Sequence, residues 1–419
     1  MKQLTTYLNH RYTLYVLLLV AVVYSAAEAM HGGDFFIFME AAKCLRSGGD
    51  IYTTTFVSGF HYFYSPLFAR LLTPFSFLPF YIVKFSWLLL NVFFVYRIFK
   101  IVPNYLNLSV LSEQQKAAFW MLSSLLIARF IFINFHNLQM TIFLVYALIE
   151  GIQLIDEGKD IKGSMLLAFA INIKIMPIII LPWLLYRRLF KASFYVIFFV
   201  VLSFFISAAM IGWKYNMELH ASWWNLINPS NKIHLIDVDE PEFHSLTTLF
   251  PTLLMENVGG SFDLKLKRNI ANLSVETVTM IIQISRILLV CLTLYFLRSL
   301  PFRKVQSRLH QWWELSYIFL ITPLIFPHQQ FYAFFFMLPA IFYIVYYLIA
   351  NYPAEKLSRI GLCIFFVLTS FVGGMLGFAR HFSSHYKLIT YGSLILVFLL
   401  AHARPSKLNM VFVGEKEVK

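Results

Sequence analysis

Long apolar runs separated by short charged segments dominate the pattern along the chain. A membrane-spanning helix needs roughly 20 apolar residues, and the sequence offers about ten such runs. We place them near residues 11–30, 80–98, 117–134, 139–155, 192–211, 276–297, 312–327, 331–350, 360–378 and 388–402. This pattern predicts an all-α polytopic membrane protein in which residues 1–419 form a single transmembrane domain.

Residues 163–186 form a further apolar run, and its centre is interrupted by Lys174, Pro177 and Pro182. Proline removes a backbone donor and bends a helix. The length alone fits either one span or a re-entrant hairpin of two half-helices. Because Lys and Arg accumulate in cytoplasmic loops, the charge distribution can decide between these alternatives.

A re-entrant hairpin gives the stronger charge bias. It leaves 20 Lys and Arg in the cytoplasmic segments and 10 in the external ones. A single span would instead place the basic cluster at residues 298–308 outside. We therefore expect both termini in the cytoplasm and long external loops at residues 31–78 and 212–275. The first apolar run resembles a signal peptide, but we expect it to remain as the first span because Asp34 follows almost at once.

Composition supports the membrane assignment. Hydrophobic residues make up 59% of the chain and charged residues 13%, against about 45–50% and 25% in soluble proteins, which excludes an ordinary soluble enzyme. The excess of Lys and Arg in the predicted cytoplasmic segments explains the net charge of +13, so we expect no nucleic-acid partner. The three cysteines share no metal-ligand spacing, and we expect neither a disulfide framework nor a metal.

Polar and ionisable side chains gather at the expected external ends of the apolar runs. Such groups are costly near a bilayer unless they face a cavity or a partner, which makes them candidates for function. They come from segments far apart in the sequence: Asp34, His136, Asn137, Gln139, His244, His328, Gln329, Gln330, Arg380, His381 and His385. The cytoplasmic loops contain no comparable His, Asn and Gln clusters.

Each candidate also has a purely structural interpretation. Asp34 can cap the helix predicted to follow it, over residues 34–45. Asn137 and Gln139 can satisfy backbone groups of a turn, and His328 with its neighbours can pack at the membrane interface. Lys174, at the apex of the hairpin, lies too deep to reach water easily, so we favour a buried anionic partner.

Other charged groups are weaker candidates. Arg129 and Arg286 lie inside predicted spans, where we expect ion pairs within the bundle, and Glu150 is a candidate acid. The acidic run at residues 237–242 is most simply a solvated loop. Asp237-Val-Asp239 has the spacing of a metal-binding D-x-D pair, but it does not lie at the start of a predicted helix as such a site would require.

Several motifs occur in a characteristic order. The first external loop contains Gly33-Asp34-Phe35, Gly48-Gly49-Asp50-Ile51-Tyr52 and Tyr62-Phe63-Tyr64-Ser65-Pro66-Leu67. Later segments read Asn172-Ile173-Lys174-Ile175-Met176-Pro177, Glu242-Phe243-His244-Ser245-Leu246 and Thr322-Pro323 with His328-Gln329. In this order the motifs resemble glycosyltransferase family 87, the polyprenyl-phosphate-sugar-dependent membrane enzymes of GT-C fold that include bacterial mannosyltransferases.

The chain departs from the family pattern at two places. The turn Asn137-Leu138-Gln139 keeps only the glutamine of the family's motif, and Gln329 stands where the family has a second histidine. The resemblance otherwise implies a GT-C type helical bundle of about ten spans plus the hairpin, with external loops forming the active site. It also implies the bacterial cytoplasmic (inner) membrane, an active site facing the periplasm, and no metal or other cofactor.

The implied reaction moves a sugar, such as mannose, from a polyprenyl phosphate to a glycan or glycolipid acceptor. A carboxylate suits deprotonation of the acceptor hydroxyl, and we hypothesise that Asp34 is the general base of an inverting transfer. Donors must stabilise the leaving phosphate, and Lys174 and His328 are the candidates. The remaining substrate-binding candidates are Tyr64, Asn137, Gln139, His244 and Gln329.

Two other functions remain open from the sequence. A transporter or flippase of lipid-linked saccharides would equally need a broken helix near the bilayer midplane, but it predicts polar groups on both sides of the hairpin. A non-catalytic scaffold subunit would have no need to retain Asp34. The concentration of polar residues at one face favours the enzyme.

Overall fold

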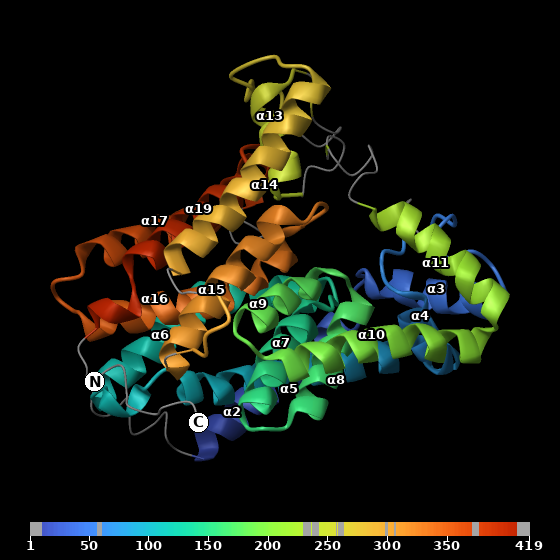
Figure 1. The fold of residues 1–419 in the computed structure, drawn as a ribbon, viewed down its shortest axis with the longest axis horizontal. Coiled ribbons are helices and arrows are strands. Elements are labelled where there is room, and N and C mark those ends of the chain that lie inside the picture. Colours follow the sequence, from blue (N-terminus) through green and yellow to red (C-terminus); the bar gives the residue numbers. More distant parts are fainter. Residues whose placement is uncertain are drawn as a thin grey trace. The chain divides into compact units, whose positions relative to one another are not determined.

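The computed structural model describes residues 11–56, 61–228, 243–256, 264–297, 301–305, 307–370 and 377–408, together with Ile236 and Val258. Within these residues the chain forms helices and no β-strand (Figure 1). Backbone contacts divide the chain into two compact units. Unit 1 holds residues 1–5, 103–133 and 232–419, and unit 2 holds residues 6–102 and 134–231. The expected all-helical class is confirmed for the described residues.

Unit 2 contains the first of the two long loops predicted to be external and the interrupted apolar run. Its N-terminal half consists of α2 (Arg11–Glu28), α3 (Phe35–Arg46), α4 (Pro66–Leu72), the 3-10 helix η2 (Thr73–Phe77) and α5 (Phe80–Tyr105). Its second half consists of α7 (Thr141–Asp156), α8 (Asp160–Ile173), η4 (Met176–Ile179), α9 (Ile180–Tyr186), α10 (Phe190–Ile211) and α11 (Trp213–Ile227). The last residues of α5 belong to unit 1.

Helices α7 and α8 pack closely through glycine. A Cβ on Gly163 of α8 would lie 2.4 Å from the carbonyl oxygen of Gly151 in α7, so only a hydrogen fits there. Small residues allow such close approach of helices in membrane proteins, where lipid supplies no hydrophobic drive for association. This contact holds α8 firmly within unit 2.

The chain reverses between α8 and α9. Helix α8 ends at Ile173, the C-cap residue Lys174 has an extended backbone, and Pro177 follows in η4. The Lys191 ammonium, at the start of α10, pairs with Asp160 at the start of α8 at 3.1 Å. These two helix starts therefore lie together, and Lys174 lies about 21 Å away at the other end of the 14-residue helix α8. The re-entrant hairpin at residues 163–186 stays a prediction.

Unit 1 is built mainly from the C-terminal half of the chain. Its helices are α6 (Glu113–His136, up to Ile133), α13 (Leu246–Leu254), α14 (Val275–Leu297), α15 (Arg308–Ile325), α16 (Leu338–Ala350), α17 (Lys356–Ser370), α18 (Gly377–His385) and α19 (Leu388–His402). Short 3-10 helices are η3 (Leu108–Val110), η5 (Phe331–Met337) and η6 (Pro405–Lys407). Helices α17 and α19 run side by side (Figure 1).

Two tryptophans of α15 anchor the core of unit 1. The indole N–H of Trp312 donates to the Pro339 carbonyl at 3.0 Å, and that of Trp313 donates to the Leu400 carbonyl at 3.0 Å. A buried indole needs an acceptor for its N–H group. These bonds connect α15 to both α16 and α19. Helix α16 is almost wholly buried.

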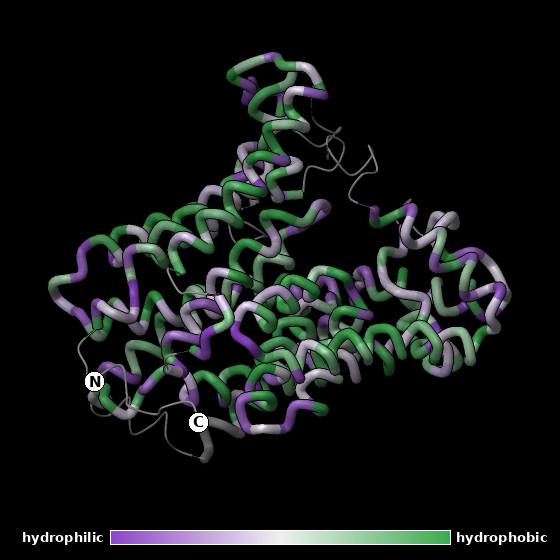
Figure 2. Tube along the Cα trace, viewed as in Figure 1, coloured by the Kyte–Doolittle hydropathy of each residue, from purple (hydrophilic) through white to green (hydrophobic). Residues whose placement is uncertain are grey.

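Five helices among the described residues are long and apolar enough to cross a membrane: Phe80–Tyr105, Glu113–His136, Phe190–Ile211, Val275–Leu297 and Phe331–Ala350. Figure 2 shows α10 as hydrophobic along most of its length. Other predicted spans correspond to shorter helices, such as the 16-residue α7. These helices are consistent with a multi-pass membrane protein, and the full set of about ten spans stays a prediction.

Both long predicted loops contain helices. The helix expected at residues 34–45 is present as α3 (Phe35–Arg46). The second loop, residues 212–275, contains α11 and α13, and its acidic run at residues 237–242 lies outside the described residues.

Candidate functional site

The turn before α3 packs against the turn after α6, and a glycine permits the contact. Gly33 has φ +144°, a conformation that side chains rarely adopt. A Cβ there would lie 2.6 Å from Leu138 Cδ1 and 3.3 Å from the Asn137 carbonyl oxygen. The backbone N–H of Asp34 donates to this same oxygen at 3.2 Å. Two segments far apart in the sequence therefore meet at Asp34.

The Asp34 side chain is directed to Gln139. Asp34 occupies the N-cap position of α3, but its carboxylate makes no capping hydrogen bond. Instead, Gln139 Nε2 donates to Asp34 Oδ2. Gln139 is 1% exposed, and its Oε1 has no hydrogen-bond partner among the described residues. This contact orients the Asp34 carboxyl group toward Gln139.

Replacing Gly33 by alanine is expected to destabilise the protein by about 1–3 kcal/mol, the range for a strained backbone position, and to lower activity by displacing Asp34. Thermal unfolding of the purified protein in detergent measures this change. Gly32→Ala is the matched control, because a Cβ there meets nothing within 4 Å. Equal effects of both substitutions would contradict the packing role of Gly33.

The segment that carries Tyr64 is tied to the end of α8. Ser65 Oγ donates to Asn172 Oδ1 at 2.9 Å, and Asn172 Nδ2 donates to Ser203 Oγ at 2.7 Å. The Ser65 N–H donates to the Ile173 carbonyl at 3.4 Å. Because Tyr64 precedes Ser65 and Lys174 follows Ile173, these bonds fix Tyr64 and Lys174 next to each other.

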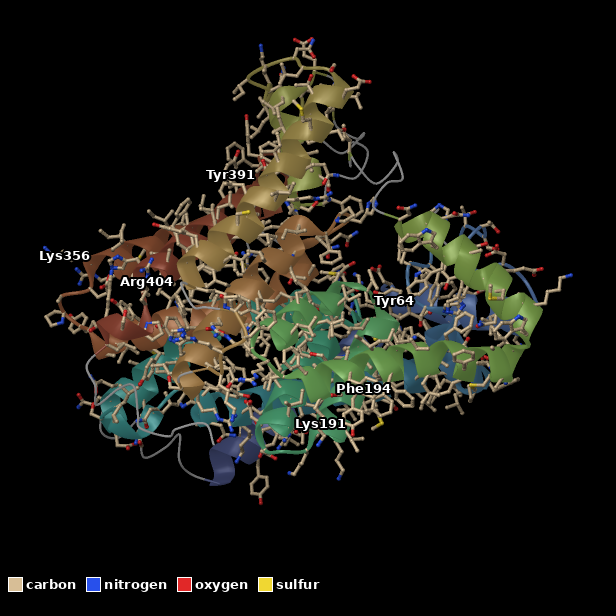
Figure 3. The ribbon with its side chains drawn as sticks, viewed as in Figure 1. Tyr64, Lys191, Phe194, Lys356, Tyr391 and Arg404 are labelled. Carbon is tan, nitrogen blue, oxygen red and sulfur yellow. The ribbon has the colours of Figure 1, made fainter. Side chains whose placement is uncertain are left out.

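Lys174 joins Tyr64 and Asp34 electrostatically. Its Nζ lies 5.6 Å from the centroid of the Tyr64 ring, a cation–π distance, and its ammonium group interacts with the Asp34 carboxylate. Burial, reinforced by Asp34, raises the pKa of Tyr64 well above its usual value, so the phenol stays neutral. In Figure 3, Tyr64 is well separated from Lys191, in agreement with their places near opposite ends of α8. Carboxylate, ammonium, amide and phenol thus gather in unit 2.

Helix α11 holds the segment between α3 and α4 in place. Ser222 Oγ donates to Asp50 Oδ2 at 2.8 Å, and the indole N–H of Trp223 donates to the Phe63 carbonyl at 3.2 Å. Figure 1 shows α11 beside α3 and α4. Asp50 therefore links this segment to α11.

The other predicted residues meet in unit 1. The His244 N–H donates to the Gln329 carbonyl at 2.8 Å, and Thr390 Oγ1 donates to the His244 carbonyl at 2.7 Å. The His328 ring lies 5.1 Å from the Phe243 ring. His244, His328 and Gln329 are thus neighbours within unit 1, as Asp34, Tyr64, Asn137, Gln139 and Lys174 are within unit 2.

Polar atoms in the unit 1 cluster are buried without partners. His244 is 0% exposed, and neither ring nitrogen has a hydrogen-bond partner among the described residues. Burial lowers the pKa of His244 well below its usual value, and the positive charges of Lys387 and Arg129 lower it further, which keeps the imidazole neutral. Gln329 Oε1 is also buried and unpartnered in this part of the structure. Since buried polar atoms are normally hydrogen-bonded, this cluster is suited to a polar ligand.

Two expectations for charged groups inside helices need correction. Glu150 is not an available acid, because Arg97 binds both of its oxygens at 2.7 and 2.9 Å. Arg129 was expected to form an ion pair, but Nε, Nη1 and Nη2 are all buried without a hydrogen-bond partner in the part of the chain that the structure describes.

Metal binding has no structural basis in the described residues, where no group of three or more His, Cys, Asp and Glu is placed to hold an ion. The Asp237-Val-Asp239 pair lies outside those residues. The absence of a metal requirement therefore stays a prediction.

Comparison with known proteins identifies one family. A family model described as glycosyltransferase family 87 matches residues 62–327, well over half of the chain. No curated protein and no solved structure matches. The matched range includes Tyr64, Lys174 and His244, whereas Asp34 precedes it and His328 follows it directly.

Proposed function

The chain belongs to glycosyltransferase family 87, a family of membrane glycosyltransferases, and on that premise we propose that it uses a polyprenyl-phosphate sugar as donor. The transferred sugar is a hexose such as mannose, and the acceptor is a glycan or a glycolipid. The observation that carries this proposal is the Asp34 carboxylate, held by Gln139 and next to the charge of Lys174. A fixed base near a cation is what attack by a hydroxyl on a sugar phosphate needs.

The transfer occurs in one displacement. Asp34 takes the proton of the acceptor hydroxyl as its oxygen attacks the anomeric carbon. The bond from that carbon to the phosphate oxygen breaks, and its electron pair leaves with the lipid phosphate. The new glycosidic bond forms on the opposite face, so the anomeric configuration inverts.

Neighbouring side chains support this displacement. Lys174 stabilises the negative charge that develops on the leaving phosphate, and Tyr64 offers a neutral hydroxyl and an aromatic face to the sugar. Gln139 orients the Asp34 carboxyl group and offers its free Oε1 to a substrate hydroxyl. Asn137 positions Asp34 through its backbone carbonyl.

His328 is our second candidate for the donor phosphate, with His244 and Gln329 as its substrate-binding neighbours in unit 1. We place the reaction at the external face of the bacterial cytoplasmic membrane, because positive charge concentrates in the opposite set of loops. The chemistry assigned here requires neither a metal nor a cofactor.

Labelled donor in proteoliposomes tests this function. Purified protein is reconstituted with a panel of radiolabelled polyprenyl-phosphate hexoses and candidate lipid acceptors. We expect acceptor-dependent loss of label from the donor and its appearance in a new glycolipid. Movement of intact donor across the bilayer without transfer would support the flippase alternative and contradict the proposal.

A further inference from the structure

Arg129 is a buried cation whose donors are unused. It lies in α6, one of the helices long and apolar enough to span a membrane. Its Nε, Nη1 and Nη2 are buried, and the described residues offer none of them a hydrogen-bond acceptor. The guanidinium lies 4.3 Å from the centroid of the Phe130 ring, but an aromatic ring does not neutralise a buried charge, which is strongly unfavourable without a counter-ion. A bound anion would remove this cost.

His244 lies within the electrostatic reach of Arg129 and Lys387. Thr390 connects two of these groups directly, because its Oγ1 donates to the His244 carbonyl at 2.7 Å and its N–H donates to the Lys387 carbonyl at 3.0 Å. Lys387 is 1% exposed. Lys387 and Arg129 both act on His244 as positive charges.

We propose that Arg129, His244 and Lys387 form a binding site for a phosphate group within unit 1. The guanidinium fork matches two phosphate oxygens at once. A neutral imidazole supplies one further N–H donor, and the lysine supplies a second positive charge. A phosphate monoester offers three acceptor oxygens and close to two negative charges, which suits these groups better than the two oxygens and single charge of a carboxylate.

The phosphate reaches this site either on a lipid or free in solution. The apolar helix that carries Arg129 favours a lipid-borne phosphate, which can approach from the bilayer. Under the proposed function that lipid is the polyprenyl phosphate released by the transfer, which Lys174 stabilises as it leaves, and this identification rests on that function. The anion site itself rests only on the buried donors and the positive charges.

Ligand-dependent thermal unfolding tests the site in the purified full-length protein in a non-ionic detergent. The probes are polyprenyl monophosphate, the uncharged polyprenol of the same length, and inorganic phosphate. A ligand that binds the folded protein raises Tm. We expect polyprenyl monophosphate to raise Tm and polyprenol to have a smaller effect.

Arg129→Gln should weaken binding of polyprenyl monophosphate by at least about tenfold, as expected for a lost charged hydrogen bond. Without ligand, its Tm should equal or exceed that of the wild type, because the substitution removes an unpaired buried charge. Arg129→Lys should restore part of the binding. Arg286→Gln, in the apolar helix α14 of the same unit, is the matched control and should bind as the wild type does.

The two sources of phosphate give different results. Polyprenyl monophosphate binding that depends on Arg129 supports a lipid-borne phosphate. Stabilisation by inorganic phosphate alone, lost in Arg129→Gln, supports a free phosphate at the same site. Should Arg129→Gln not fold, Lys387→Asn replaces it, because Lys387 has φ +55° and asparagine tolerates that conformation.

Two results would overturn the site: unchanged phosphate binding in Arg129→Gln, or equal stabilisation by polyprenol and polyprenyl monophosphate with no effect of inorganic phosphate. A lower Tm in Arg129→Gln with unchanged binding would show a purely structural role. Binding is measured here without sugar transfer. A protein that transfers sugar while binding phosphate independently of Arg129 would therefore refute this site and leave the proposed function intact.

Discussion

Asp34→Asn is expected to lower the rate of sugar transfer by about 10²–10⁴-fold, the usual contribution of a general base. The asparagine is nearly isosteric, and its carbonyl oxygen can still accept the hydrogen bond from Gln139 Nε2. The backbone bond to Asn137 is also retained. The substitution therefore removes the proton acceptor and keeps the fold. Initial rates with a polyprenyl-phosphate sugar measure the loss, and thermal unfolding verifies the structure.

Glu40→Gln is the control for this substitution. Glu40 lies on the same helix, α3, and undergoes the same carboxylate-to-amide change, but it pairs with Lys43 at 2.8 Å at a partly exposed position. We expect this variant to transfer sugar as the wild type does. Near-normal turnover of Asp34→Asn would remove Asp34 from the mechanism.

Lys174→Met is expected to lower sugar transfer by about 10²–10³-fold, the range for loss of one group that stabilises charge in the transition state. Methionine keeps an unbranched apolar chain against the Tyr64 ring and removes the ammonium. We expect the change to reduce kcat and to raise KM for the donor, with little effect on KM for the acceptor. Steady-state kinetics with both substrates varied separates these effects.

Lys191→Met provides the matched control. Lys191 is an exposed lysine near the other end of α8, where it pairs with Asp160. Its loss should leave both Michaelis constants unchanged. If Lys174→Met also left the donor KM and the rate unchanged, the assignment of Lys174 to the leaving phosphate would be refuted.

The choice of candidate residues follows from local sequence alone. Polar groups at the ends of apolar runs are expensive in a membrane wherever the rest of the chain lies, so Asp34, Gln139, Lys174 and His244 could each be selected individually. The helix after Asp34 could also be predicted from local sequence, because the capping residue and the apolar residues that indicate it lie next to one another in the chain. The roles of these residues in the reaction remain predictions.

The contacts between them depend on tertiary structure. Gln139 and Asp34 are 105 residues apart, and no local pattern pairs them. Ser65 and Asn172 lie within the quoted motifs, yet their link was missed because serine and asparagine are also ordinary turn and cap residues. Their positions beside Tyr64 and near Lys174 were the available signal.

The sequence also could not predict which charged side chains inside the helices form ion pairs with one another. Arg129 and Glu150 are both charged residues within predicted spans. Only the structure shows that Glu150 forms its ion pair with Arg97. The number of spans depends on how shorter helices such as α17 lie in a bilayer, which hydropathy along the chain does not determine.

Transfer to azide tests the role of Asp34 most directly. Azide attacks the anomeric carbon without losing a proton, so it needs no general base. With polyprenyl-phosphate sugar and azide in place of the acceptor, we expect Asp34→Asn to form the inverted glycosyl azide while its transfer to a hydroxyl acceptor stays impaired. Parallel loss of both reactions in Asp34→Asn would contradict the assignment of Asp34 as the base.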